Sequence, residues 1–496
     1  LLLCCMVLTL LPVTASAAET GAMDNIPAKF DVEIDLCNRT SDINIKDSKT
    51  YYIYSSSSDP DFVWTKKIQI NGKKAAPHIF LDNVNIQVNK DAKTPAIELH
   101  GKASAYLYFI NRDSKLTGAT GRAAIQKNRS EGQLCVQVMK GTTVTCQGGY
   151  KAAGIGGSWA TRNIAESLFN LDMYGHGANM HFGSQTNPSL WSGTIIAKGG
   201  DGGAGIGGGR NGSGEKLYFY SGKIEAKGGE AASGIGGSFK GRGRDIYIYG
   251  GDISATGGTA GAGIGGGCWT SEQDMDGDTA AYNINIYGGK INAHGGYNGA
   301  GIGGGQYVPA RDITITGGEV TAAGGGNGAG IGGGLRKEGE KITVSGDATL
   351  KVQGGPTDEW DGAGAGIGNG GSHNGDFSGS FTPVNGAETE PDTSNLTTGK
   401  IEYYAPGADM TKDEPTSTTF GSLVQPEPSS PGETGAPVEY RMQTSASEPV
   451  QGNGKSTGYK APVQGHFYQV VDQDGKDMIF ATAQKKDVLA IATDSD

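Results

Sequence analysis

The sequence predicts an all-β protein that folds as a right-handed parallel β-helix, a solenoid with rungs of ~29 residues. A glycine-rich motif, Gly-Ala-Gly-Ile-Gly-Gly-Gly at residues 203–209, returns around Ile235 and Ile264. Its isoleucines, Ile206, Ile235 and Ile264, follow one another at a fixed interval of 29 residues. Between the motifs, apolar residues alternate with polar ones, as at residues 245–249, which indicates strands rather than helices. Fixed period and alternation together favour stacked rungs over a two-sheet sandwich.

The motif can be followed through most of the chain. Its clear copies are centred on Ile155, Ile206, Ile235, Ile264, Ile302, Ile331 and Ile367, and weaker copies on Ile97 and Ile125. Intervals longer than 29 residues contain insertions. We expect the repeated isoleucine to point inward and the flanking glycines to form tight corners.

Composition excludes several classes of protein. Glycine accounts for 86 of 496 residues, about two and a half times its usual share of ~7%. Collagen needs glycine at every third position, which this chain lacks. The net charge is −11, and no basic stripe is visible, so we expect no nucleic-acid partner.

The beginning of the sequence indicates secretion. Residues 1–17 contain an apolar run and end in Ala-Ser-Ala, which is typical of a signal peptide that here lacks its own start. The apolar run is shorter than the ~20 residues of a membrane span. We therefore expect a secreted, extracellular protein without a membrane span in the mature chain, with attachment to the cell surface left open.

Changes in composition suggest five segments. After the signal peptide we expect a lead-in at residues 18–45 and the β-helix at 46–375. A linker rich in Pro and Ser follows at 376–436. A small, incomplete β segment occupies 437–496, where residues 468–482 read as two strands around an Asp-Gly turn.

Four cysteines follow the signal peptide, namely Cys37, Cys135, Cys146 and Cys268. So few in a secreted chain do not make a disulfide framework. Two interpretations stay open: Cys135 and Cys146 form a pair, or all four are small residues of the interior.

Insertions point to a binding surface. Two of them begin just after the motif, at Ser158-Trp159 and at Cys268-Trp269, and therefore leave the solenoid at one corner. Insertions on one face often mark the binding face of a repeat protein. Our candidate ligand-binding residues at this corner are Trp159, Arg210, Phe239, Trp269 and Tyr307. Such aromatic rings suit stacking on sugars; alternatively, they cover glycine backbone.

Two acidic clusters suggest other chemistry. Asp274, Asp276 and Asp278 have the spacing that opens a calcium loop, although the later ligands of an EF-hand are missing, so a solvated acidic loop is the alternative. Asp358, Glu359 and Asp361 surround Trp360 in another insertion. Because glycoside hydrolysis uses a pair of carboxyl groups, these three are our candidate catalytic residues.

The repeats resemble those of the secreted Gly-Ile-Gly-Gly proteins of anaerobic Gram-positive bacteria, over about residues 65–375. The opening of this region, with Ile79-Phe-Leu-Asp-Asn-Val-Asn-Ile, Pro95-Ala-Ile97 and residues 116–125, also looks like the parallel β-helix carbohydrate-binding domains of such bacteria. The resemblance implies an extracellular or cell-surface role with glycans, in some members with calcium. The matching residues are scaffold positions, and none corresponds to a catalytic residue.

These observations lead to three functional hypotheses. The first is a bacterial surface protein or adhesin that binds an oligo- or polysaccharide, including glycans of a host cell. The second is a β-helix glycoside hydrolase or polysaccharide lyase. The third is a structural spacer without a ligand.

Overall fold

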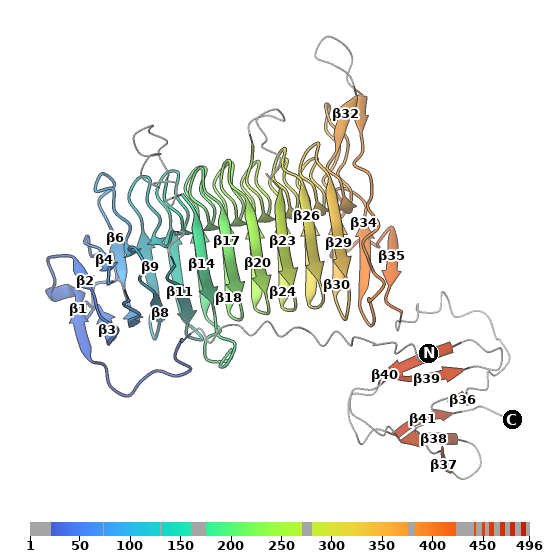
Figure 1. Ribbon diagram of the computed structural model, residues 1–496, viewed down its shortest axis with the longest axis horizontal. Helices are drawn as coiled ribbons and strands as arrows, with labels where there is room; N and C mark the ends of the chain where they lie inside the picture. Colours follow the sequence, from blue (N-terminus) through green and yellow to red (C-terminus); the bar gives the residue numbers. More distant parts are fainter. Residues whose placement is uncertain are drawn as a thin grey trace, which may run out of the picture. The chain divides into compact units, whose positions relative to one another are not determined.

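The solenoid contains three 11-stranded sheets, A, C and B, and between residues 78 and 368 each turn of the chain adds one strand to each of them in this order (Figure 1). The computed structural model describes residues 21–422 apart from 73, 129–130, 160–174, 270–279 and 375–381, and beyond them six strands between residues 441 and 492. Neighbouring strands of sheets A and B are parallel. With the right-handed sense that such crossovers take, the expected right-handed parallel β-helix is confirmed.

Sheet A is formed by strands of four to six residues. These are β1 (Val32–Asp35), β3 (Thr50–Tyr54), β5 (His78–Asp82), β8 (Ala105–Phe109), β11 (Leu134–Val138), β14 (Gly177–Phe182), β17 (Gly214–Phe219), β20 (Gly243–Ile248), β23 (Ala281–Ile286), β26 (Ala310–Ile315) and β29 (Gly339–Val344). Alternate residues are buried, as Ile246 and Ile248 are in β20, because successive side chains of a strand point to opposite faces. The inner face of sheet A therefore forms one wall of the core.

Sheet C forms the second wall. Its strands are β6 (Asn85–Gln87), β9 (Ser114–Thr117), β12 (Thr143–Gln147), β15 (Thr194–Lys198), β18 (Lys223–Lys227), β21 (Asp252–Thr256), β24 (Lys290–His294), β27 (Glu319–Ala323), β30 (Thr349–Gln353), β34 (Lys400–Tyr404) and β35 (Ser417–Phe420). In β21, Ile253 and Ala255 face the interior and their neighbours face outward. The apolar alternation in the sequence thus corresponds to the inner faces of sheets A and C.

Sheet B contains the glycine-rich motif. Its strands are β2 (Ile43–Ile45), β4 (Ile68–Ile70), β7 (Ile97–Leu99), β10 (Ile125–Gln126), β13 (Ile155–Gly156), β16 (Ile206–Gly207), β19 (Ile235–Gly236), β22 (Ile264–Gly265), β25 (Ile302–Gly303), β28 (Ile331–Gly332) and β31 (Ile367–Gly368). The isoleucines from Ile97 to Ile367 pair in register, and their exposed fraction is 0%. The predicted inward ladder of isoleucine is confirmed.

The glycine after each isoleucine is required by the backbone. Gly207 has a φ of +134°, which L side chains rarely adopt, and a Cβ atom there would lie 2.1 Å from the carbonyl oxygen of Gly236 on the next rung. Gly265 has the same conformation, with a φ of +133°. Each such glycine therefore lets one rung approach the next while the chain turns outward.

The sheets reach beyond residues 46–375 at both ends. Strands β1 and β2 lie within the expected lead-in, and β34 and β35 lie within the expected linker. The terminal strands lack the Gly-Ile-Gly motif and lie beyond the changes in composition from which we set the expected limits. At the end of sheet B, the Glu388 carboxylate accepts hydrogen bonds from the backbone N–H groups of Gly366 (2.8 Å) and Ile367 (3.1 Å). Glu388 thereby takes the place of a further rung.

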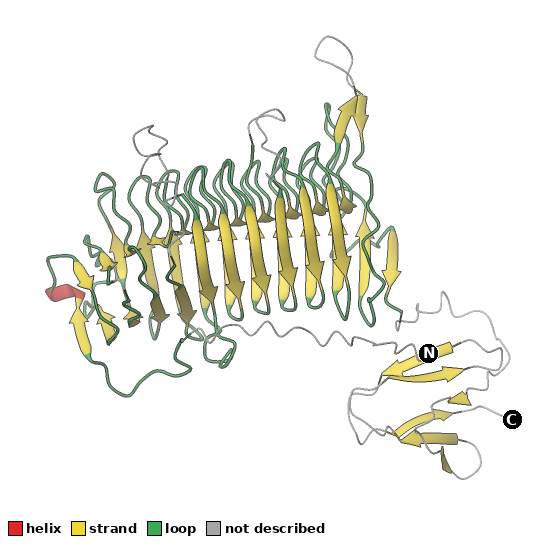
Figure 2. Ribbon diagram, in the orientation of Figure 1, coloured by secondary structure: helices red, strands yellow, loops and turns green. Residues whose placement is uncertain are grey.

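Other regular structure is sparse in the described residues, as Figure 2 shows. One 3₁₀ turn, η1 (Leu36–Asn38), precedes β2, and a hairpin of β32 (Ser372–Asn374) and β33 (Thr382–Val384) follows β31. No helix in this part of the chain is long and apolar enough to cross a membrane.

Residues 420–496 form a separate unit. It contains β36 (Arg441–Met442), β37 (Pro449–Gln451), β38 (Ser456–Lys460), β39 (Phe467–Val471), β40 (Asp477–Ala481) and β41 (Val488–Ala492) in two small sheets. Strands β39 and β40 pair antiparallel, with Tyr468 opposite Phe480. The predicted pair of strands at residues 468–482 is confirmed.

Candidate carbohydrate-binding site

Every Ile-Gly strand of sheet B lies between two loops. We call the loop from sheet C to the isoleucine the preceding loop, and the loop from the glycine to sheet A the following loop. The following loop of one rung bonds to the preceding loop of the rung before it: the N–H of Arg210 donates to the carbonyl of Lys151 (2.9 Å), and that of Leu335 to Asn298 (3.0 Å). The loops form a row along the upper edge of the solenoid in Figure 1, which we call the loop edge.

The predicted ligand-binding residues lie in the following loops but are not strongly exposed. Trp159, Arg210, Phe239, Trp269 and Tyr307 are all half-buried. The ring of Trp159 covers Gly121, whose position for a Cβ atom is 3.5 Å from Trp159 Cε3. These contacts favour the alternative role that the sequence left open, in which the residues cover glycine backbone.

Cations fill the spaces between these aromatic rings. The Arg210 guanidinium lies 4.2 Å from the centre of the Phe239 ring, and Lys240 Nζ lies 5.8 Å from the centres of both Phe239 and Trp269. At the other end of the row, Arg336 lies 5.9 Å from the Tyr307 ring. The following loops thus form an alternating stack of cations and rings that packs against itself.

The exposed aromatic residues of the loop edge lie in the preceding loops. Tyr150 exposes 50% of its surface, Tyr297 52% and Trp360 51%. Tyr150 and Tyr297 each come five residues before the motif isoleucine, directly after a Gly-Gly pair. Neither tyrosine was predicted from the sequence, although this shared position could have revealed them.

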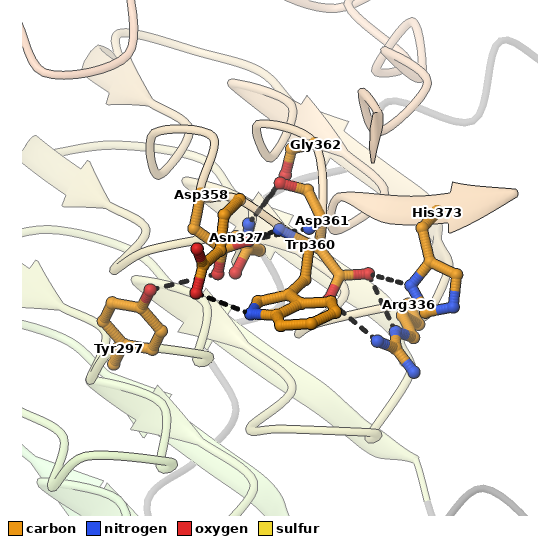
Figure 3. Close-up of polar contacts among 9 residues, drawn as sticks. Tyr297, Asn327, Arg336, Asp358, Trp360, Asp361, Gly362 and His373 are labelled. Atoms are coloured by element: carbon orange, nitrogen blue, oxygen red, sulfur yellow. Dashed lines mark hydrogen bonds and ion pairs between the residues drawn. The ribbon is translucent and has the colours of Figure 1, made fainter. Parts of the chain in front are cut away.

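Asp358 connects Tyr297 to Trp360 (Figure 3). The Tyr297 hydroxyl donates to Asp358 Oδ2 (3.0 Å), and the backbone N–H of Trp360 donates to Asp358 Oδ1 (2.8 Å). The Trp360 indole Nε1 donates to Glu359 Oε1 (2.9 Å). We call Tyr297, Asp358, Glu359 and Trp360 the Trp360 site, because hydrogen bonds hold its two exposed rings in place.

Asp361 fixes the inner end of the same insertion. Its carboxylate accepts two bonds from Arg336, from Nε at 2.9 Å and from Nη2 at 2.8 Å, and lies 2.8 Å from His373 Nδ1. Asn327 Nδ2 donates to the carbonyl oxygens of Asp361 and Gly362 (3.0 and 2.9 Å). Such bidentate pairing fixes the orientation of the guanidinium group. Because Arg336 also contacts Tyr307, the insertion is tied to the following loops.

The contacts of the candidate catalytic acids are those of structural groups. Burial raises the pKa of Asp358, but hydrogen bonds from the backbone N–H groups of Asp361 and Trp360 and from the Tyr297 hydroxyl outweigh it, so the pKa lies below its usual value. A general acid needs the opposite shift. Asp361 is buried in its ion pair, and Glu359 holds the indole of Trp360. These three carboxylates are therefore engaged in shaping the loop.

Neither the calcium hypothesis nor a disulfide gains support. Asp274, Asp276 and Asp278 lie outside the described residues. Within the residues that the structure describes, no group of three or more His, Cys, Asp or Glu side chains could hold a metal ion. Cys135 and Cys146 are both free, and they belong to different apolar clusters, Cys146 inside the solenoid and Cys135 on the outer face of sheet A.

Comparison with known proteins supports the fold. A family model described as a beta helix repeat matches residues 246–268, 284–306 and 313–335. Each matched stretch runs from a strand of sheet A through sheet C to the following loop. No curated protein and no solved structure matches the chain significantly. The chain thus contains beta helix repeats, and its ligand has to be argued from the loop edge itself.

Proposed function

We propose that this protein binds carbohydrate at the Trp360 site. The observation that carries the proposal is the pair of rings, Tyr297 and Trp360, that are half exposed and yet fixed by hydrogen bonds to carboxylates. Exposure of large aromatic side chains to water is unfavourable, and neighbouring exposed apolar side chains often mark an interaction site. Rings that are held rigidly in such a position are typical of binding surfaces.

The chemistry of the site suits a sugar. An aromatic ring offers an apolar surface to the C–H face of a pyranose, while carboxylate oxygens accept hydrogen bonds from its hydroxyl groups. The Asp358 and Glu359 carboxylates lie beside the two rings. Because the rings are already oriented, binding loses little side-chain entropy.

The spacing of the rings favours an oligosaccharide over a single sugar. Tyr297 precedes Ile302, Trp360 precedes Ile367, and one rung with Ile331 lies between them. Two steps of the strand spacing amount to roughly 10 Å. A ligand that contacts both rings therefore extends over more than one sugar unit.

The proposed setting is extracellular. The expected signal peptide lies outside the described residues, and it supports secretion by its sequence alone. In this setting the protein acts as a glycan-binding surface protein or adhesin. No contact of the described residues favours the enzyme alternative, because Asp358, Glu359 and Asp361 all hold the loop.

A glycan array probed with the full chain tests the proposal. We expect binding to at least one class of oligosaccharide, and no binding of the Trp360→Ala variant to the same spots. Absence of binding to any glycan at high protein concentration contradicts the proposal. Incubation of the bound glycan with the protein, followed by an assay for new reducing ends, separates binding from hydrolysis.

A further inference from the structure

The outer face of sheet A carries a second set of aromatic residues, arranged in columns along the solenoid. In one column, Tyr218 stacks on Tyr247 with ring centres 5.1 Å apart. In the next, Tyr249 stacks between Tyr220 (5.3 Å) and Tyr287 (5.0 Å), with the three ring planes nearly parallel. Because the ring faces cover one another, it is the ring edges and hydroxyl groups that face outward. This surface therefore differs from the Trp360 site, where half of each ring is exposed.

The first rungs show what this face binds. Residues 22–30 lie along it without regular secondary structure, and their apolar side chains Ala22, Met23, Ile26 and Phe30 pack on a cluster that includes Phe80, Tyr106, Tyr108 and Trp191. We call residues 22–30 the N-terminal strap. Phe30 stacks on Tyr52 with ring centres 4.9 Å apart.

Hydrogen bonds from aromatic side chains hold the backbone of the strap. The hydroxyl of Tyr108 accepts a bond from the N–H of Met23 (2.7 Å), and the indole of Trp191 donates to the carbonyl of Asp24 (3.1 Å). Asn187 donates to the same carbonyl (3.1 Å). The strap is thus held by the hydroxyl of Tyr108 on sheet A and by two donors from the loop between β14 and β15, all aimed at its main chain.

The same columns continue beyond the strap. In one column, Cys135, His181 and Tyr218 follow one another in register on successive strands. In the neighbouring column, Tyr108 pairs with Gln137, which lies two residues after Cys135. Among the residues that the structure describes, the hydroxyls of Tyr218, Tyr249 and Tyr287 have no hydrogen-bond partner, and Tyr287 is 37% exposed. Phenol groups can both donate and accept. The second half of the face therefore offers hydroxyl groups of the kind that Tyr108 uses to hold the strap.

We infer that the open half of sheet A, marked by Tyr218, Tyr249 and Tyr287, is a docking surface for an extended polypeptide segment of a partner protein. The segment has apolar residues spaced as in the strap. The surface is continuous with the one that the strap already occupies, and the inference is independent of the glycan site. Sugar is disfavoured here because stacking on a sugar needs exposed ring faces.

A peptide with the sequence of residues 21–31, carrying a fluorophore, is the probe. We expect it to bind the full chain, measured by fluorescence anisotropy, and to bind at least tenfold more weakly when Tyr218, Tyr249 and Tyr287 are all replaced by Phe. These substitutions keep the stacked rings and therefore the fold. The Tyr150→Phe variant, which loses a hydroxyl on the loop edge, is the matched control and keeps full affinity.

Three results of the peptide-binding assay would overturn the inference. The first is no binding of the peptide, and the second is binding that the triple Phe variant leaves unchanged. The third is binding that is lost in the Tyr108→Phe variant instead, which would mean that the peptide replaces the strap at its own position. Displacement of the peptide by an oligosaccharide that also requires Tyr218, Tyr249 and Tyr287 would equally contradict it.

Discussion

The two loops that flank each Ile-Gly strand use aromatic residues in opposite ways. In the following loops, Phe239 is sandwiched between Arg210 and Lys240 and is half-buried. In the preceding loops, Tyr297 and Trp360 keep about half of their surface exposed. Both loops adjoin the same Ile-Gly strand, so the difference arises from what lies beside each ring. The rings of the following loops are covered by cations from the same or the neighbouring rung, whereas Tyr297 and Trp360 are held at their polar edges by carboxylates.

The largest effect is expected at the glycine that both loops share. The Gly265→Ala substitution places a Cβ atom 2.0 Å from the carbonyl oxygen of Gly303 at a φ of +133°. We expect a loss of more than about 4 kcal/mol in the free energy of unfolding. Chemical denaturation monitored by circular dichroism measures it. The control is Gly141→Ala, where φ is +83° but no atom lies within 4 Å, so the cost is about 1–2 kcal/mol.

The next effect concerns the anchor of the preceding loop. The Asp361→Ala variant leaves Arg336 and His373 without the carboxylate that pairs with both. Removing one partner of a buried ion pair costs about 3–5 kcal/mol, and the partial exposure of Arg336 reduces this to about 2–3 kcal/mol. Differential scanning calorimetry gives the change. Equal stability of the variant and the parent would show that the pair does not hold the insertion.

A smaller loss of stability is expected in the following loops. The Phe239→Ala variant removes a half-buried ring and its contacts with Arg210 and Lys240. We expect a loss of about 1–2 kcal/mol with unchanged binding of glycan. Urea titration measures the first quantity and isothermal titration calorimetry the second. A loss of glycan binding by a variant of normal stability would show that the glycan binds at the following loops instead.

The smallest effect depends on pH. The folded pKa of Asp358 lies below its unfolded value, so the ionised carboxylate stabilises the loop above the unfolded pKa of ~3.9. This contribution is lost as the pH falls through the folded pKa. Glycan binding should therefore be constant from about pH 5 to 7 and decline below about pH 4. The Asp358→Asn variant should lack this decline; an identical profile in the variant would assign the decline to another group.

The fold could be predicted from the sequence because every rung of a solenoid repeats the same positions at a fixed interval. Stacked rungs repeat Ile206, Ile235 and Ile264 at one position, and the glycine beside each has a φ that other residues avoid. The ends of the solenoid were less predictable. Strands such as β34 have ordinary alternation without the motif, and the Glu388 cap depends on contacts between residues about 20 positions apart.

The site was predicted only in part. Asp358, Glu359 and Asp361 were singled out for their carboxylates, and the structure places them beside Trp360 as expected from their adjacency. Their link to Tyr297 joins residues 61 positions apart, which no local pattern reveals. The position of Trp159 and Trp269 suggested exposure, but both are half-buried, because Trp159 lies over Gly121 and Trp269 lies beside Lys240.

We propose that glycan binding depends on the preceding loops and not on the following loops. Isothermal titration calorimetry with a glycan identified on the array should compare the parent with Trp360→Ala and Trp269→Ala, which remove the same side chain from the two kinds of loop. We predict that Trp360→Ala weakens binding at least tenfold, about 1.4 kcal/mol, while Trp269→Ala leaves the affinity unchanged. An unchanged affinity of Trp360→Ala together with a tenfold loss in Trp269→Ala would contradict the account.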